Sequence, residues 1–302
     1  MTRIRSLRSA GARHVRVVLL ALAFAGASAF AAASFAHLDA RGVVWGAVVG
    51  VVLCAMLSSI VTIHEMAHLV TGRLLGVRSD AFSVGFGPEI LGATRGGVRW
   101  SWRVVPLGGY VRLVGESDPA VPGGLAAAGT LRTSLVYLAG PVANVGTAAL
   151  AAAGLAVARG VDPARIPEAV AAILWYALEI TGRLFAEWIP SMASNLAAMP
   201  FGGIPSMFVA FDQALRSGPF LMTVLFILLN LSIGLMNLLP IPPLDGGQAA
   251  LSLARARLGD RLPEAAVRRA VRVGFAGLLV FMLAVNVIDL LRWTLGGYTP
   301  GA

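Results

Sequence analysis

Long apolar runs separated by short polar segments make up most of the sequence. Five of these runs have about the 20 residues that a helix needs to cross a bilayer: Val17–Ala36, Val43–Ile63, Leu135–Val157, Phe220–Leu239 and Val273–Leu291. The pattern predicts a mostly α-helical, polytopic membrane protein with about five transmembrane helices.

A less apolar stretch, Pro167–Trp188, lies between the third and fourth runs. Its charged residues Glu179, Arg183 and Glu187 recur every four positions, which places them on one face of a helix. A helix with one charged face suits the membrane interface better than a sixth span. We therefore expect an interfacial helix in this part of the chain.

Apolar and polar residues alternate with a period of two around residue 100, where residues 98–104 read VRWSWRV. This alternation is typical of a strand, and the glycines on both sides supply turns. The segment 80–115 is therefore predicted to form a small re-entrant β-sheet of about four strands. An exposed edge of such a sheet can pair with an unwound substrate, and Gly108, Gly109 and Tyr110 are the candidate residues.

These elements divide the chain into three parts. Residues 1–42 form a basic segment with an extra transmembrane helix, residues 43–292 the membrane core, and residues 293–302 a C-terminal tail. The core includes the β-rich loop and an extracytoplasmic connector at 159–219.

The composition supports a bilayer environment. Of the 302 residues, 57% are hydrophobic and 13% charged, and the mean hydropathy is +0.79. A soluble domain averages about 45–50% apolar and 25% charged residues. A single cysteine, Cys54, excludes an internal disulfide and a multi-cysteine metal site.

The positive charge is carried by arginine alone, with 24 basic residues and a net charge of +9. A basic chain is a candidate for nucleic-acid binding. Here the arginines lie between apolar runs, so orientation in the lipid bilayer explains them and no nucleic-acid partner is expected. Segments 1–16, 71–132 and 247–272 hold 5, 7 and 6 of them, which predicts a cytoplasmic N-terminus and an outside C-terminus. The alternative for residues 1 to 32 is a cleaved signal peptide.

The most specific motif, His64-Glu65-Met66-Ala67-His68, follows directly on the second apolar run. The H-E-x-x-H pattern puts two imidazoles one turn apart on one helix face, placed to bind a Zn²⁺ ion. Glu65 lies beside them and can accept a proton from a metal-bound water. Ionisable residues within a span are costly and usually functional, which makes two satisfied core histidines the weaker alternative.

A catalytic zinc site needs a third protein ligand and an open position. The best candidate is Asp245, within a stretch from Asn237 that reads NLLPIPPLDGG. Its prolines break the helix, and irregular backbone at membrane depth must be buried in protein or line a cavity. Zinc coordination would stabilise the carboxylate, whereas a helix-ending turn with Asp and Gly is the alternative.

At these two motifs the chain resembles the site-2 protease family of intramembrane zinc metalloproteases, in particular the bacterial regulator of sigma-E protease type. That family carries H-E-x-x-H on one transmembrane helix and N-x-x-P-x-x-x-L-D-G near another, and both patterns stand here. Residues 82–88, Pro106–Val111 and Ala139–Asn144 resemble further family segments. The likeness covers roughly residues 45–292.

The resemblance implies one Zn²⁺ per chain, bound by His64, His68 and Asp245, with Glu65 as the general base. It also implies that Asn237 holds the substrate backbone or the developing oxyanion. Substrates would be transmembrane segments of other proteins in the bacterial inner membrane, as in regulated cleavage of anti-sigma factors or clearance of signal-peptide remnants. The sequence does not define an oligomeric state.

One departure from the family concerns the connector at 159–219, where relatives carry one or two PDZ domains. This segment has about sixty residues, too few for a PDZ domain beside the interfacial helix. Two other functions are open at this point. A transporter would also have broken helices and intramembrane carboxylates, and a non-catalytic metal-binding membrane protein would need the histidines but not Glu65.

Overall fold

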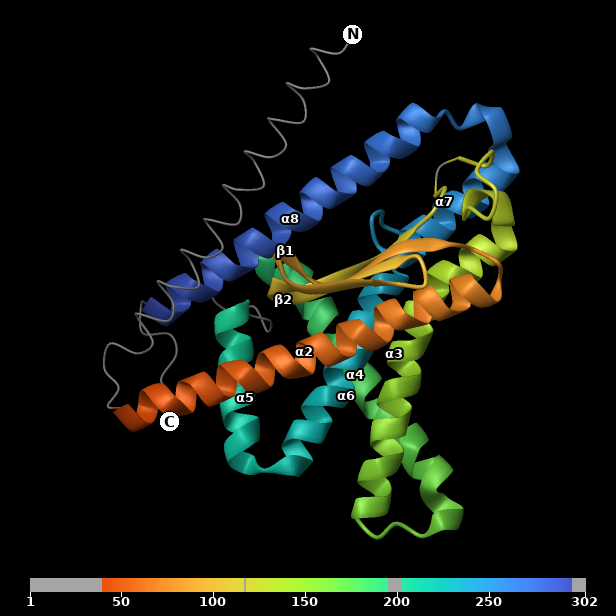
Figure 1. The fold of residues 1–302 in the computed structure, drawn as a ribbon. Helices are drawn as coiled ribbons and strands as arrows, with labels where there is room; N and C mark the ends of the chain where they lie inside the picture. Colours follow the sequence, from red (N-terminus) through yellow and green to blue (C-terminus); the bar gives the residue numbers. More distant parts are fainter. Residues whose placement is uncertain (1–39, 117, 195–202, 295–302) are drawn as a thin grey trace.

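The computed structural model describes residues 40–116, 118–194 and 203–294. In chain order its helices and strands are α2 (Ala40–Leu74), β1 (Ser79–Arg95), β2 (Val98–Leu113), α3 (Thr130–Ala158), α4 (Ile166–Ser194), α5 (Ile204–Ser217), α6 (Pro219–Leu238), α7 (Asp245–Leu258) and α8 (Glu264–Thr294). Figure 1 shows their arrangement.

Four helices in the described part of the chain are long and apolar enough to cross a membrane: Arg41–Leu74, Thr130–Ala158, Pro219–Leu238 and Glu264–Arg292. They match the second to fifth predicted spans, which are therefore confirmed. The first predicted span, Val17–Ala36, lies outside the described residues.

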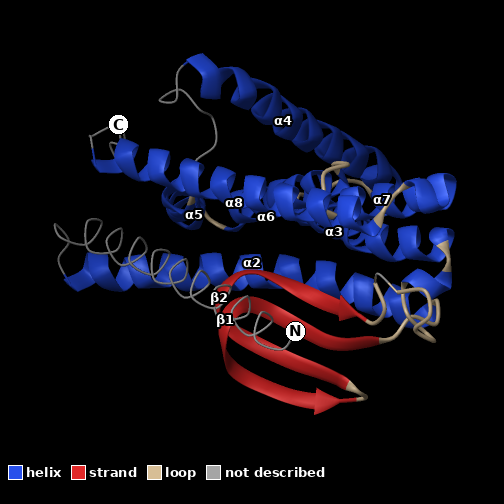
Figure 2. Cartoon of the chain, turned by 90° about the horizontal axis from the view of Figure 1, so that it is seen from above, coloured by secondary structure: helices blue, strands red, loops and turns tan. Residues whose placement is uncertain are grey.

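The helices form layers, with α2 and the sheet on one side, α4 on the other and the remaining helices between them (Figure 2). In the interior, Ala148 and Ala152 of α3 pack with Ala177 of α4 and with Ile227 and Leu231 of α6. Small residues on α3 allow the backbones of these helices to approach closely, which is the usual way in which helices associate in membranes.

The sheet is built from two long strands that pair antiparallel with several register shifts. Residues 81–84 pair with both 99–102 and 109–112, and residues 91–95 pair with 98–102. Each strand therefore pairs along two of its segments, and the predicted small β-sheet is present (Figure 2). The segment 109–112 forms one edge of the sheet.

The sheet covers the C-terminal half of α2. Leu69 of α2 is buried against Phe82 and Val84 of β1 and Val98 of β2. This packing holds the sheet beside the H-E-x-x-H motif. The edge segment 109–112 therefore lies near that motif.

The connector between α3 and α6 contains α4 and α5, and its described residues include no strand. The predicted interfacial helix is present as α4, where Arg183 pairs with Glu179 at 2.5 Å. Its depth in a membrane stays a prediction. Helix α5 ties two spans together, because Trp45 of α2 donates to Asp212 at 2.5 Å and the Ser206 amide donates to Asp289 of α8 at 2.7 Å.

Candidate metal centre

The two histidines of the motif lie in the C-terminal half of α2 and point into the protein. His64 is 7% exposed and His68 6%. Their rings meet edge to face, with centroids 4.8 Å apart, as expected for residues one helical turn apart. The two imidazoles predicted to share one helix face do so.

Asp245 is the first residue of α7, directly after the proline-rich turn that ends α6. Two glycines allow this turn to fold tightly, because a Cβ at Gly246 would lie 2.2 Å from the Leu238 carbonyl oxygen. A Cβ at Gly247 would lie 2.3 Å from the Ile241 carbonyl carbon. The Asp-Gly-Gly sequence is therefore what lets the carboxylate turn back toward α2.

The Asp245 carboxylate meets both histidines. Its Oδ2 lies 3.0 Å from Nε2 of His64 and 3.3 Å from Nε2 of His68. Ligand atoms about 2.0–2.2 Å from a tetrahedral metal lie about 3.3 Å from one another. Two imidazole nitrogens and a carboxylate oxygen at this spacing fit Zn²⁺, and these residues form a group that could hold a metal ion.

The charge of Asp245 suits a cation site. Burial by itself raises the pKa of Asp245, but the hydrogen bonds from His64 and His68 lower it below its ordinary value. The carboxylate therefore stays ionised at neutral pH and can bind a cation.

A backbone carbonyl orients the second imidazole. Nδ1 of His68 lies 2.7 Å from the carbonyl oxygen of Val136 on α3. A proton on Nδ1 donates to this carbonyl, so Nε2, the nitrogen next to Asp245, is the atom that would bind a metal, which is how ligating histidines are commonly held.

Gly140 on α3 completes the wall of the site. A Cβ at this position would lie 2.4 Å from Nε2 of His68 and 2.6 Å from Nε2 of His64. The residue appeared in the sequence only as part of a family-like stretch, without a role. No local signal marks it, because the contact joins segments more than seventy residues apart.

The predicted base and the predicted strand edge are adjacent. A Cβ at Gly109 of β2 would lie 3.2 Å from Cγ of Glu65 and 2.6 Å from the Ser83 carbonyl oxygen. Gly109 pairs with Val84 of β1 in this part of the sheet. The sheet edge thus borders the metal centre on the side of Glu65.

The other predicted substrate-binding residues lie around this edge. Gly108 has φ +129°, and a Cβ there would lie 2.5 Å from the Phe86 ring. Tyr110 pairs with Ser83 across the sheet. Asn237, in the last turn of α6, donates from Nδ2 to its own helix at 3.0 Å, which leaves Oδ1 as its acceptor. Their roles toward a substrate stay predictions.

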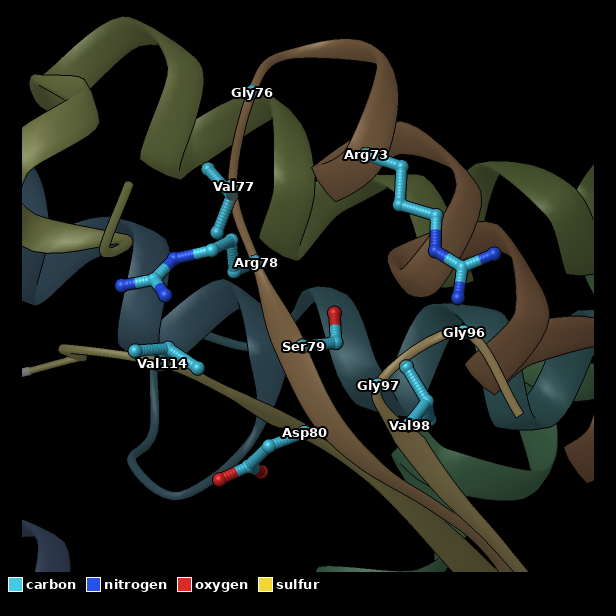
Figure 3. A pocket seen from close by; sticks show the side chains of 10 residues that line it. All are labelled: Arg73, Gly76, Val77, Arg78, Ser79, Asp80, Gly96, Gly97, Val98 and Val114. Carbon is cyan, nitrogen blue, oxygen red and sulfur yellow. The ribbon is translucent and has the colours of Figure 1, made fainter. Parts of the chain in front are cut away.

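A shallow pocket lies elsewhere, where α2 ends and β1 begins (Figure 3). It contains no histidine, and its one acid, Asp80, is paired with Arg112 at 2.5 Å. The guanidinium groups of Arg73 and Arg78 point to different sides of the chain. This pocket therefore does not compete with the metal centre as a reaction site.

The fold and the site together define a class: a multispan membrane protein with a buried two-histidine, one-aspartate centre beside a glutamate. A family model described as peptidase family M50 matches residues 52–281. The chain belongs to this family, which is that of the site-2 proteases, and it is an integral membrane protein. The match includes all four residues of the centre.

Curated relatives agree over shorter stretches. A protein of Agrobacterium fabrum named "putative zinc metalloprotease" is 48% identical over 82 residues, which cover 27% of this chain and 21% of that protein. A protein of the same description from Rhizobium meliloti is 53% identical over 66 residues, 22% of this chain and 18% of its own length. A third protein of this description, from Clostridium perfringens, is 31% identical over 104 residues, which cover 34% of this chain and 31% of that protein. The matched stretches thus span less than a third of these relatives.

Proposed function

We propose that this protein is an intramembrane zinc metalloprotease, which hydrolyses peptide bonds within or near transmembrane segments of membrane proteins. The observation that carries the proposal is the meeting of His64, His68 and Asp245 within a buried part of the helical core, with Glu65 next to them. A site for binding metal alone would not need the glutamate.

In this proposal one Zn²⁺ is held by His64, His68 and Asp245. When bound, zinc supplies Lewis acidity that activates a water and polarises the peptide carbonyl. Glu65 accepts a proton from the attacking water and passes it to the leaving amine as the C–N bond breaks.

The substrate must be unwound before it is cut, because a helix conceals its peptide groups. The edge formed by Gly108, Gly109 and Tyr110 would hold the unwound segment by strand pairing, next to Glu65. The Oδ1 of Asn237 would accept a hydrogen bond from the substrate backbone. A Cβ at residue 109 would lie 3.2 Å from Cγ of Glu65, so glycine at this position leaves room between the edge and the base.

Strand pairing predicts a period of two in the response to backbone changes. A synthetic transmembrane peptide that the protein cuts is N-methylated at one residue at a time around the cleavage site. Because alternate N–H groups of a paired strand face its neighbour, cleavage should fall about fivefold at every second position, as expected for the loss of one hydrogen bond. The positions between serve as internal controls, and equal sensitivity at all positions would rule out pairing.

We further propose that the protein lies in a bacterial inner membrane with the segment 71–132 in the cytoplasm, from the distribution of arginine. Regulated cleavage of anti-sigma factors and clearance of signal-peptide remnants are the two roles that the family resemblance suggests. Substrates already trimmed to short extracytoplasmic parts would suit a connector of two helices at 159–219.

Cleavage of a transmembrane peptide by purified protein in lipid vesicles tests the proposal. Activity should disappear with a zinc chelator and return when Zn²⁺ is added back. Cleavage that persists after complete removal of metal contradicts the proposal. Absence of cleavage in the zinc-loaded protein, together with metal-dependent flux across the vesicle, would favour a transporter.

A further inference from the structure

Asn144 of α3 is completely buried, with 0% exposure. Neither of its side-chain atoms, Nδ2 or Oδ1, has a hydrogen-bond partner within the described part of the chain. Burying an amide without a partner costs several kcal/mol on transfer scales, and the interior of a membrane protein offers no bulk water to recover it. Either an ordered water or a bound substrate is therefore expected to form a hydrogen bond with Asn144.

Asn144 lies on α3 between the metal centre and α6, because a Cβ at Gly234 of α6 would lie 3.3 Å from Cβ of Asn144. It lies one turn after Gly140, which is the residue of α3 that touches the ligand nitrogens of His64 and His68. Four residues advance a helix by about 6 Å and turn it by about 40°, so the two residues face nearly the same way. Helical side chains lean toward the N-terminus and cover the preceding turn. We therefore expect the amide of Asn144 to lean toward Gly140, which has no side chain to block it.

Complete burial does not separate Asn144 from the site, because the ligands His64 and His68 are buried to nearly the same degree. Two other asparagines are less available. Asn230 of α6 donates its amide to the Phe226 carbonyl at 2.9 Å, and Asn237 donates to Ile233 at 3.0 Å. Of these three side chains, Asn144 is the one whose Nδ2 has no hydrogen-bond partner in the described part of the chain.

We propose that Asn144 is a catalytic residue that donates a hydrogen bond to the carbonyl oxygen of the scissile peptide bond as negative charge develops on it. The proposal rests on the proposed protease function. A preorganised amide donor in a site closed to water raises the reaction rate by about 10²–10³-fold. This assignment leaves Asn237, through its Oδ1, to hold the substrate backbone.

The test compares wild type with Asn144→Leu, and with Asn230→Leu as a matched control from an equally buried position. Leucine has a similar volume, and removing a partnerless amide in this way is neutral or stabilising for folding. We expect kcat to fall about 10²-fold in Asn144→Leu, with KM, zinc content and melting temperature kept. Asn230→Leu should retain its kcat.

Binding supplies a readout independent of turnover. A phosphinic peptide, which mimics the tetrahedral carbon, should bind zinc-loaded Asn144→Leu about 10²-fold more weakly than wild type. The cleaved product peptide should bind both proteins equally. Should Asn144→Leu not fold, Asn144→Ala replaces it with the same expected results.

Three outcomes overturn the inference: wild-type kcat in the Asn144 variant, loss of its zinc, or equal weakening of mimic and product. Wild-type kcat would mean that the amide binds a buried water or serves packing. Loss of zinc, or equal weakening of mimic and product, would mean that the residue supports the structure of the site and not the transition state. These outcomes are distinct from failure of the proposed function, in which wild type itself cuts nothing when loaded with zinc.

Discussion

Changing Glu65 to glutamine is expected to reduce cleavage by about 10²–10⁴-fold, the usual contribution of a general base, while zinc stays bound. The amide of glutamine has nearly the shape of the carboxylate but cannot accept the proton of the attacking water. The ligands His64, His68 and Asp245 are untouched by this substitution. Turnover of a transmembrane peptide and metal analysis of the same preparation check the two halves of the prediction.

The matched control for this substitution is Glu168→Gln on the exposed face of α4, which should cut like wild type. Substantial activity in Glu65→Gln would show that another group takes the proton. Loss of zinc in Glu65→Gln would instead make the glutamate part of the metal shell.

Replacing Gly140 with alanine is expected to abolish both zinc binding and cleavage. The added Cβ would lie 2.4 Å from Nε2 of His68 and 2.6 Å from Nε2 of His64, closer than any unbonded carbon approaches nitrogen. Either the methyl group occupies the place of the metal or α3 moves away from α2. Both results remove the ligand geometry, so zinc content and activity should fall together.

Gly146→Ala on the same helix is the control, because a Cβ there would meet no atom within 4 Å. Alanine is favoured over glycine in a helix by about 1 kcal/mol, so this variant should be at least as stable as wild type. Full zinc occupancy in Gly140→Ala would show that α3 does not border the metal as closely as the described contacts place it.

The sequence predicted the parts of this fold that repeat with a simple period. Four described spans and the strand segments around Trp100 follow from runs and alternation that depend on local sequence alone. Helix α5 was missed, because its apolar residues Phe208 and Phe211 lie in a short stretch that resembles a connector. Its packing on α2 and its bonds to Asp289 belong to tertiary structure, which no periodicity records.

The metal centre likewise has residues that local sequence predicts and residues that only the tertiary structure reveals. His64, Glu65 and His68 share one helix turn, so their spacing alone predicted a metal-binding face. Asp245 required a guess about which distant carboxylate returns to that face. Gly140 and Asn144 could not be found in this way, since a glycine that leaves room and an amide without a partner are recognised only when the neighbouring helices are in place.

The central claim is that His64, His68 and Asp245 together hold a zinc ion. Metal analysis of purified wild type, Asp245→Ala and the exposed-residue control Asp162→Ala tests it most directly. The account predicts about one zinc per chain in wild type and in Asp162→Ala, as for a catalytic site with three protein ligands, and almost none in Asp245→Ala. Full zinc occupancy in Asp245→Ala would contradict it.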